Sequence, residues 1–187
     1  MNDALLVGPT AQQDLYSIVL RFRTYQTAFT AYVAKMYRQV RIHQDDRKLQ
    51  RILWRRSAEE PLRTYLLSTV TYGTASAPYL ATRCLQHLAE DKSKDFSLAP
   101  ETLTNNFNVD DALCGANTIK DALRLEQELI GLLGRGGFHL RKFCASHPSI
   151  LKAVPPDCRE TEVSIELDSN EGIKTLSLLW HHYQITS

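Results

Sequence analysis

The sequence predicts an α+β protein with an antiparallel sheet and helices packed on one face of that sheet. Segments in which apolar and polar residues alternate, as in strands, are interspersed with segments whose apolar residues recur at helical spacing. In the middle of the chain the order is strand, helix, hairpin, helix, strand, which is the β-α-β-β-α-β arrangement. The 187 residues, 43% of them hydrophobic and 23% charged, suit a sizeable core. We therefore expect residues 1–187 to form a single domain.

A helix and a strand are predicted first. Residues 10–25 carry apolar side chains at helical spacing, and Thr10 is a candidate N-cap. Residues 28–33 are predicted as a strand, whose alternation places Tyr32 on the face opposite Phe29. Tyr32 is bulky and uncharged at a position where its surroundings suggest a smaller, charged residue.

The next segments predict two strands, a helix and a hairpin. The stretches "LQRILWRR" and "RTYLLSTVTYG" have strand-like composition and flank the loop "SAEEPL". The stretch "SAPYLATRCLQHLAED" is predicted as a helix with Ser76 as its cap and Pro78 in its first turn. A hairpin over residues 103–116 follows, with its bend near Asp110 and Asp111.

The last third of the chain predicts a helix, a strand and a closing hairpin. Thr118 and Asp121 form a capping box before "IKDALRLEQELIGLLGRGG", and Gly134 is placed to end that helix. The stretch "FHLRKF" is predicted as a strand. The stretches "ETEVSIELD" and "IKTLSLLWHHYQ", joined by the turn "SNEG", predict a hairpin over about residues 160–184.

Positive charge is concentrated in one part of a chain whose net charge is only +1. Residues 35–63 contain nine basic and four acidic side chains, and Arg51, Arg55 and Arg56 lie close together within them. Such a surplus can contact a nucleic-acid backbone. The alternative interpretation is a solvated, charged face of a hairpin.

Three further features bear on the compartment. No apolar run approaches the roughly 18 residues needed to span a bilayer, so no membrane contact is expected. The N-terminus, "MNDALLVGPT", has no basic segment followed by a long apolar one, so no signal peptide is visible. The cysteines lack paired spacing, which favours reduced thiols. We expect an intracellular protein, in the cytoplasm or the nucleus.

The stretch "FNVDD" is the first that carries chemistry. A hairpin bend that projects carboxylates offers the hard oxygen ligands that Mg²⁺ prefers. Adjacent aspartates are also common in turns, because their side chains form local hydrogen bonds. Taken alone, Asp110 and Asp111 therefore fit a turn as well as a metal site.

Several stretches together carry a likeness to one family; in chain order they are "MNDALLVGP", "RFRTYQTAFTAYVAKMYRQV", "TVTYGTASAPYLATRCL", "NNFNVDDALCG", "GGFHLRKF" and "KTLSLLW". They resemble the reverse transcriptases (RNA-directed DNA polymerases) of retroelements, most closely those of BEL/Pao retrotransposons, over nearly the whole chain. The second to fifth stretches resemble polymerase motifs A, B, C and D, and the last resembles the segment that enters the primer grip.

The resemblance implies a polymerase palm that transfers nucleotides from dNTP to a primer on an RNA or DNA template, using two Mg²⁺ ions. It assigns Asp110 and Asp111 as the motif C carboxylates that hold the metal. The motif A aspartate, which binds both ions in the family, matches Tyr32. A phenol is neutral at pH 7 and cannot replace that carboxylate, so catalysis is expected to be lost.

Further positions match the family in part. Tyr37 corresponds to the residue that stacks under the sugar, Tyr72 and Gly73 to motif B residues near the incoming nucleotide, and Lys142 to the motif D lysine that protonates pyrophosphate. Without the resemblance these would be a buried aromatic, a plain turn and a surface lysine. Asn108 replaces the motif C tyrosine, and Ser177 replaces a family glycine.

The resemblance also implies what surrounds a palm. It starts after the upstream fingers and stops before the thumb, so we expect incomplete fingers and thumb, and self-association through the apolar surface thereby exposed. The alternative function is a non-catalytic nucleic-acid-binding or protein-interaction module, domesticated from a retrotransposon and using the basic residues of 35–63. A decayed copy without a role is the third alternative.

Overall fold

The computed structural model describes residues 2–160, 173–175 and 178–180. Their centre is a four-stranded sheet in the order β4-β5-β1-β6, and every pairing in it is antiparallel. Its strands are β1 (Thr27–Val33), β4 (Phe107–Asn108), β5 (Asp111–Ala116) and β6 (Leu140–Ala145). The predicted α+β class and antiparallel sheet are confirmed.

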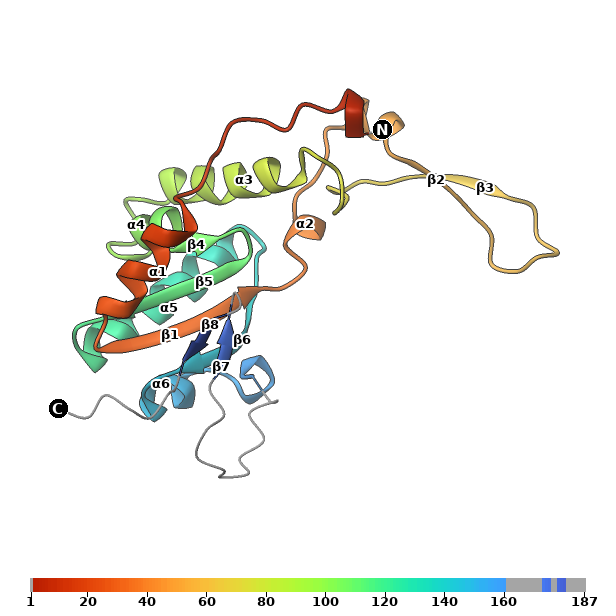
Figure 1. Cartoon of the computed structure of the whole chain (residues 1–187). Coiled ribbons are helices and arrows are strands. Elements are labelled where there is room, and N and C mark those ends of the chain that lie inside the picture. The colour runs from red at the N-terminus through yellow and green to blue at the C-terminus, as the bar shows by residue number, and fades with distance from the viewer. Residues whose placement is uncertain (1, 161–172, 176–177, 181–187) are drawn as a thin grey trace.

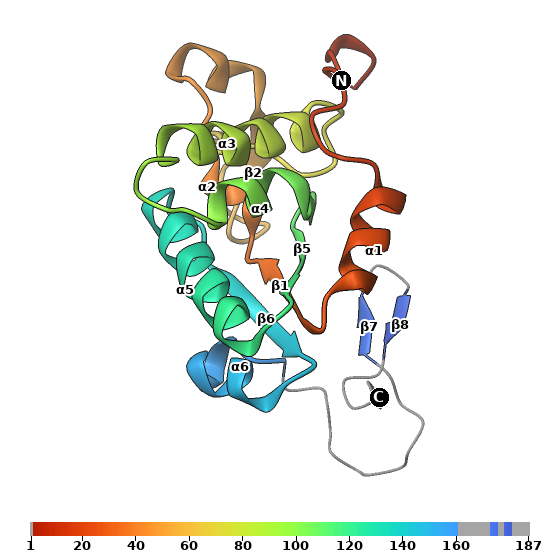
Figure 2. The same cartoon turned by 90° about the vertical axis from the view of Figure 1, so that its left-hand side faces the viewer.

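Three helices cover one face of this sheet, as Figure 2 shows; they are α3 (Ala77–Asp91), α4 (Ala99–Asn105) and α5 (Ile119–Arg135). Phe29, Ala31 and Val33 of β1 point into the core that these helices form. Burial of this apolar surface is the main driving force for folding. α6 (Pro148–Ala153) and the short helix η3 (Pro156–Cys158) pack beside β6.

The opposite face carries α1 (Leu15–Thr24), so the prediction that helices lie on one face holds only for α3, α4 and α5. Ile18 and Phe22 of α1 pack on Ala28 and Leu113 near the beginning of β1. Tyr32 shares this face but lies at the other end of β1, where its side chain is only half-buried. α1 thus leaves the end of the strand that carries Tyr32 partly accessible.

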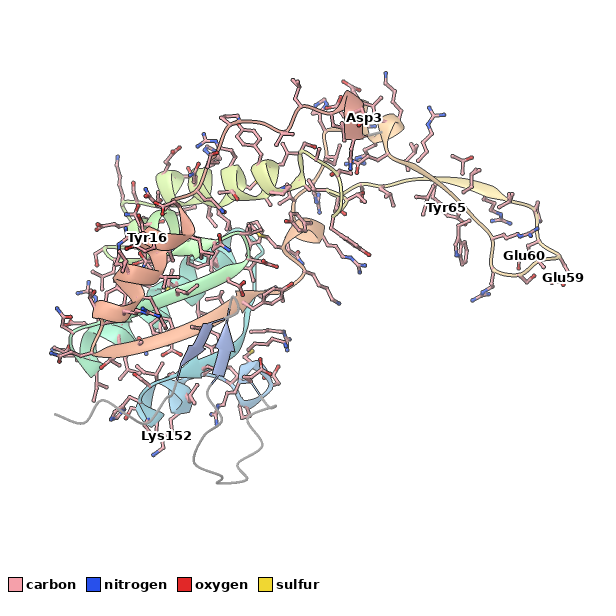
Figure 3. All side chains as sticks on the ribbon, viewed as in Figure 1. Asp3, Tyr16, Glu59, Glu60, Tyr65 and Lys152 are labelled. Carbon is pink, nitrogen blue, oxygen red and sulfur yellow. The ribbon has the colours of Figure 1, made fainter. Side chains whose placement is uncertain are left out.

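Residues 44–66 form an arm that projects from the rest of the molecule (Figure 1). It follows α2 (Met36–Gln39) and consists of η2 (Gln44–Leu49), β2 (Arg51–Trp54) and β3 (Arg63–Leu66). Arg51 pairs with Leu66 and Trp54 with Arg63, so each of the two predicted stretches contains a strand. β3 covers only the first four residues of the stretch predicted over residues 63–73. All residues of both strands are exposed, and Figure 3 shows Glu59 and Glu60 at the tip of the arm.

The structure corrects two of the predicted boundaries, one near the N-terminus and one in the middle of the chain. The first helix begins at Leu15 rather than at residue 10, because Asp14 supplies its cap by accepting a hydrogen bond from the Ser17 N–H at 2.9 Å. The predicted first strand of the 103–116 hairpin is mostly helix, since α4 runs to Asn105. Glu128 of α5 accepts hydrogen bonds from the N–H groups of Leu98 and Ala99, at 2.7 and 3.2 Å, and so caps α4. The bend itself lies at Val109 and Asp110, close to where it was predicted.

The closing hairpin also differs from the prediction. β7 (Ile173–Thr175) pairs with β8 (Leu178–Trp180), so both strands lie inside the segment predicted as one strand. The predicted partner strand falls on residues 160–168, which beyond Glu160 lie outside the described residues. α5 is capped by Thr118 as predicted, but it continues through Gly134 to Arg135. No helix in the described ranges is long and apolar enough to cross a bilayer.

Candidate functional site

A tight turn between β4 and β5 presents the two aspartates. Because Asn108 pairs with Asp111, only Val109 and Asp110 form the loop. Val109 has φ 56°, which suits the first central residue of a type II′ turn but is strained for a β-branched side chain. Such strain tends to be retained where a site needs a fixed backbone. The Val33 N–H donates to the Asp110 carbonyl at 2.8 Å, which ties the turn to the end of β1.

Tyr32 lies directly across from this turn. It is the cross-strand partner of Asp111, so the two side chains share one face of the sheet. Burial raises the pKa of the Tyr32 phenol, and the charge of Asp110, a hydrogen bond to Asp110 and the charge of Asp111 raise it further. The phenol is therefore protonated and donates a hydrogen bond to Asp110.

Tyr37 is a second tyrosine close to Asp110. It lies on α2, which begins after Lys35 reverses the chain with a φ of 50°. Tyr37 is half-buried and packs against the main core. Burial raises the pKa of its phenol, and the charge of Asp110 adds to this shift. We call Tyr32, Tyr37, Asp110 and Asp111 the Tyr–Asp cluster.

The two carboxylates of the Tyr–Asp cluster repel one another. Burial raises the pKa of Asp111 to about 6, and the neighbouring charge of Asp110 contributes to the rise. A nearby like charge disfavours the ionised form of a carboxyl group. A cation bound between the aspartates would relieve this repulsion.

The donor set nevertheless does not fit a site for two Mg²⁺ ions. Two magnesium ions need several anionic oxygens, whereas the third nearby oxygen, on Tyr32, is a neutral phenol engaged with Asp110. Within residues 2–160 and the two short C-terminal strands, no group of three or more His, Cys, Asp or Glu side chains is placed to hold a metal ion. The arrangement therefore offers two carboxylates covered by a hydrogen-bonded phenol.

Tyr72 and Gly73, the residues that the resemblance matched to motif B, lie in the loop before α3. Tyr72 is exposed, and Gly73 has φ +82°, a conformation that favours glycine. A Cβ at Gly73 would meet nothing within 4 Å, so the space above this backbone is open. The Gly73 carbonyl accepts a hydrogen bond from Asn2 Nδ2 at 3.1 Å. The structure thus keeps Tyr72 and Gly73 accessible, and their roles stay predictions.

Lys142 lies on β6, on the other side of β1 from the turn. The register between β1 and β6 shifts between Thr30 and Tyr32, and Lys142 sits at this bulge with φ 55°. Its ammonium group is 3.5 Å from Glu160 Oε2. Lys142 therefore forms an ion pair with Glu160. Among the described residues, no ion pair joins Lys142 to the Tyr–Asp cluster.

The three predicted nucleic-acid-binding arginines lie on the arm. Arg51 Nε donates to the Lys48 carbonyl at 2.8 Å, and an Arg55 guanidinium nitrogen donates to the Ala58 carbonyl at 2.8 Å. Arg51, Arg55 and Arg56 are exposed, so their remaining donors face solvent. The structure separates these arginines from the sheet that carries the Tyr–Asp cluster (Figure 1).

One further residue of the site, Gln12, was not predicted from the sequence. Its Nε2 donates to Asn108 Oδ1 at 3.0 Å, and its Oε1 accepts from the Val109 N–H at 3.0 Å. Gln86 of α3 donates to the Ala11 carbonyl, which fixes the neighbouring backbone. Gln12 thus holds the strained turn from a segment nearly a hundred residues away, a distance over which local sequence patterns carry no signal.

No protein-family model matches this chain, and no curated protein matches it either. The likeness to reverse transcriptases therefore depends on the quoted motifs alone.

Proposed function

We propose that this chain is a reverse-transcriptase-like polymerase palm whose catalytic site has degenerated. The observation that carries the proposal is the contact between Tyr32 and the aspartate pair. Tyr32, at the position of the motif A aspartate, pairs with Asp111 and hydrogen-bonds to Asp110. An antiparallel sheet with a turn that presents two carboxylates, and helices behind it, is compatible with a palm.

The proposal explains why polymerisation should fail. In two-metal catalysis, the metal ions hold the attacking and leaving oxygens, and anionic ligands must balance their charge. Tyr32 brings no charge, its ring lies beside the position that a carboxylate would take, and its hydroxyl uses Asp110 as an acceptor. Each 1.36 kcal/mol of lost transition-state stabilisation lowers the rate about tenfold, so losing an anionic ligand removes nearly all activity.

The arm favours a second candidate function, nucleic-acid binding without catalysis. It carries Arg51, Arg55 and Arg56 in solvent, and Trp54 and Tyr65 lie in an edge-to-face contact with ring centroids 5.9 Å apart. Exposed arginines beside aromatic rings suit phosphate contacts and base stacking. Binding through the arm would persist after catalysis was lost, so the two candidates are compatible.

Restoring the carboxylate tests the polymerase proposal. Tyr32→Asp is introduced into the chain, and the chain is joined to the upstream fingers of a BEL/Pao-like reverse transcriptase. Primer extension on an RNA template with dNTP and Mg²⁺ is then measured. We expect templated product from the Tyr32→Asp chimera, none from the Tyr32 chimera, and loss of product again when Asp110→Asn is added.

Two results would count against the proposal. Templated synthesis by the Tyr32 chimera would show that the phenol does not block the site. Failure of the Tyr32→Asp chimera, when the protein is folded and binds the primer–template, would show that these residues do not form a polymerase site.

A further inference from the structure

A polar cavity of about 440 Å³ is lined by residues of α2 and of the segments at the base of the arm. Its lining consists entirely of polar side chains, three of them arginines: Arg38, Gln39, Arg41, Arg47, Ser68 and Thr69. We call it the arginine cavity. It shares no residue with the Tyr–Asp cluster.

The backbone that carries the arginine cavity is held in place. Arg41 and Thr69 form an antiparallel bridge, and the Ile42 N–H donates to the Ser68 carbonyl at 2.9 Å. The Val70 N–H donates to the Val40 carbonyl, also at 2.9 Å, and both valines are buried in the main core. The lining residues from the two segments therefore stay together without a ligand.

No acidic side chain in the described part of the chain pairs with the arginines of the cavity, Arg38, Arg41 and Arg47. Arg47 Nε donates to the Ile42 carbonyl at 3.2 Å, which orients its guanidinium group. The acidic residues just before it in η2 are exposed, and Asp45 lies 3.6 Å from His43 Nδ1. Three cationic groups thus share one cavity with two hydroxyl donors.

We propose that the arginine cavity binds backbone phosphate groups of a nucleic-acid strand. Guanidinium groups bind phosphate oxygens through paired hydrogen bonds, and the Ser68 and Thr69 hydroxyls add further donors. The lining contains no aromatic or aliphatic side chain on which a base could stack, so the cavity suits the backbone rather than a free nucleotide. Its position beside the arm allows one strand to contact both the cavity and the arginines of the arm.

This inference specifies the nucleic-acid-binding part of the proposed function and is independent of lost catalysis. Its test uses the whole wild-type chain with EDTA present, so that the Tyr–Asp cluster and metal ions play no part. Binding of a fluorescent oligothymidine is followed by anisotropy over a series of salt concentrations. The double variant Arg41→Gln/Arg47→Gln is compared with Arg23→Gln, an exposed arginine on α1.

The expected result is a change in both affinity and salt dependence. Each lost phosphate contact lowers the slope of log K against log salt by about 0.7 for a single strand, so the double variant should lose roughly 1.4. It should also bind at least about tenfold more weakly at low salt, whereas Arg23→Gln should lose less than about twofold. Thermal unfolding of Arg23→Gln should match that of the wild type, because Arg23 is exposed. The double variant also loses the hydrogen bond from Arg47 to Ile42, so its thermal unfolding is measured to show that it is folded at the temperature of the binding assay.

Three outcomes would overturn the inference. They are the absence of oligothymidine binding, binding that the double variant leaves unchanged, and equal weakening by Arg23→Gln. Inorganic phosphate and a phosphoserine peptide are tested in parallel. If either binds in an Arg41- and Arg47-dependent manner while oligothymidine does not, the cavity takes another source of phosphate and the nucleic-acid assignment is wrong.

Discussion

Tyr32 and Asp111 lie opposite each other in the antiparallel pairing of β1 with β5, and their side chains share the face of the sheet that α1 leaves partly accessible. A neutral phenol therefore stands beside two carboxylates, one of which accepts its hydrogen bond. Under the proposed function, these two carboxylates would be the remaining acidic part of a metal site, and Tyr32 would stand where a third carboxylate had been.

The raised pKa of Asp111 predicts how stability depends on pH. Because its folded pKa of about 6 exceeds the ordinary value of 3.8, the folded protein binds the proton more tightly than the unfolded chain. The stability that Asp111 contributes is thus complete below pH 3.8 and is lost as the pH rises through 6. Asp111→Asn stays neutral and should be more stable than the wild type above pH 7, by up to about 2 kcal/mol after allowance for solvent screening.

Chemical denaturation between pH 4 and pH 8 measures this difference. The control is Asp46→Asn, the same substitution at an exposed aspartate of η2 outside the Tyr–Asp cluster. If Asp111→Asn follows the wild-type curve at every pH, the aspartate pair is not coupled in the way described.

Gln12 is expected to stabilise the turn that carries Asp110. Gln12→Met keeps the length of the side chain but removes two hydrogen bonds and leaves the Val109 N–H without its acceptor, which should cost about 1–2 kcal/mol. Gln13→Met is the matched control. Within the described part of the chain, the Gln13 side chain makes one exposed hydrogen bond, of 3.5 Å, so its loss should cost less than about 0.5 kcal/mol. Urea denaturation compares the two. Equal losses would mean that Gln12 does not hold the turn.

Replacing glutamate by methionine should change the stability of the protein in opposite directions at two positions of α5. Glu126 is buried, and neither of its carboxylate oxygens has a hydrogen-bond partner among the described residues. Burial raises its pKa to about 7 from 4.5, so the stability that it contributes is complete below pH 4.5 and is lost as the pH rises through 7. Glu126→Met should therefore stabilise the protein at pH 8, by roughly 2–3 kcal/mol, and change little at pH 4.

Glu128, two residues later, caps α4 by accepting hydrogen bonds from Leu98 and Ala99. Glu128→Met should destabilise the protein by about 1–2 kcal/mol. Thermal unfolding at both pH values checks the pair of variants. A loss of stability in Glu126→Met at pH 8 would contradict the assignment of Glu126 as an uncompensated buried acid.

The sequence predicted the elements whose signals are local. The strand predicted over residues 28–33, the Thr118 cap of α5 and the bend near Asp110 depend on neighbouring residues, and each is present in the structure. α4 was missed because its cap comes from Glu128, on another helix. β7 and β8 were merged into one strand, because the composition of residues 173–180 is uniformly strand-like.

The candidate site was predictable only in part. Its aspartates stand out as a pair in the sequence, but nothing local links them to Tyr32, and the resemblance to motif A supplied that link. Gln12 and the arginine cavity depend on contacts between distant segments, and composition alone showed only that residues 35–63 are basic. The sequence therefore indicated which side chains could take part in a site, but only the fold shows which of them lie together.

Metal binding by Tyr32→Asp tests the central claim most directly. Titration with Mn²⁺, followed by calorimetry, compares the wild type with Tyr32→Asp and with Tyr16→Asp, which adds the same charge at an exposed position on α1 (Figure 3). We predict that Tyr32→Asp binds Mn²⁺ at least about tenfold more tightly than the other two proteins, a difference of about 1.4 kcal/mol, and that Asp110→Asn removes the gain. Equal affinities of folded Tyr32→Asp and Tyr16→Asp would contradict the claim that Tyr32 replaces a metal-binding carboxylate.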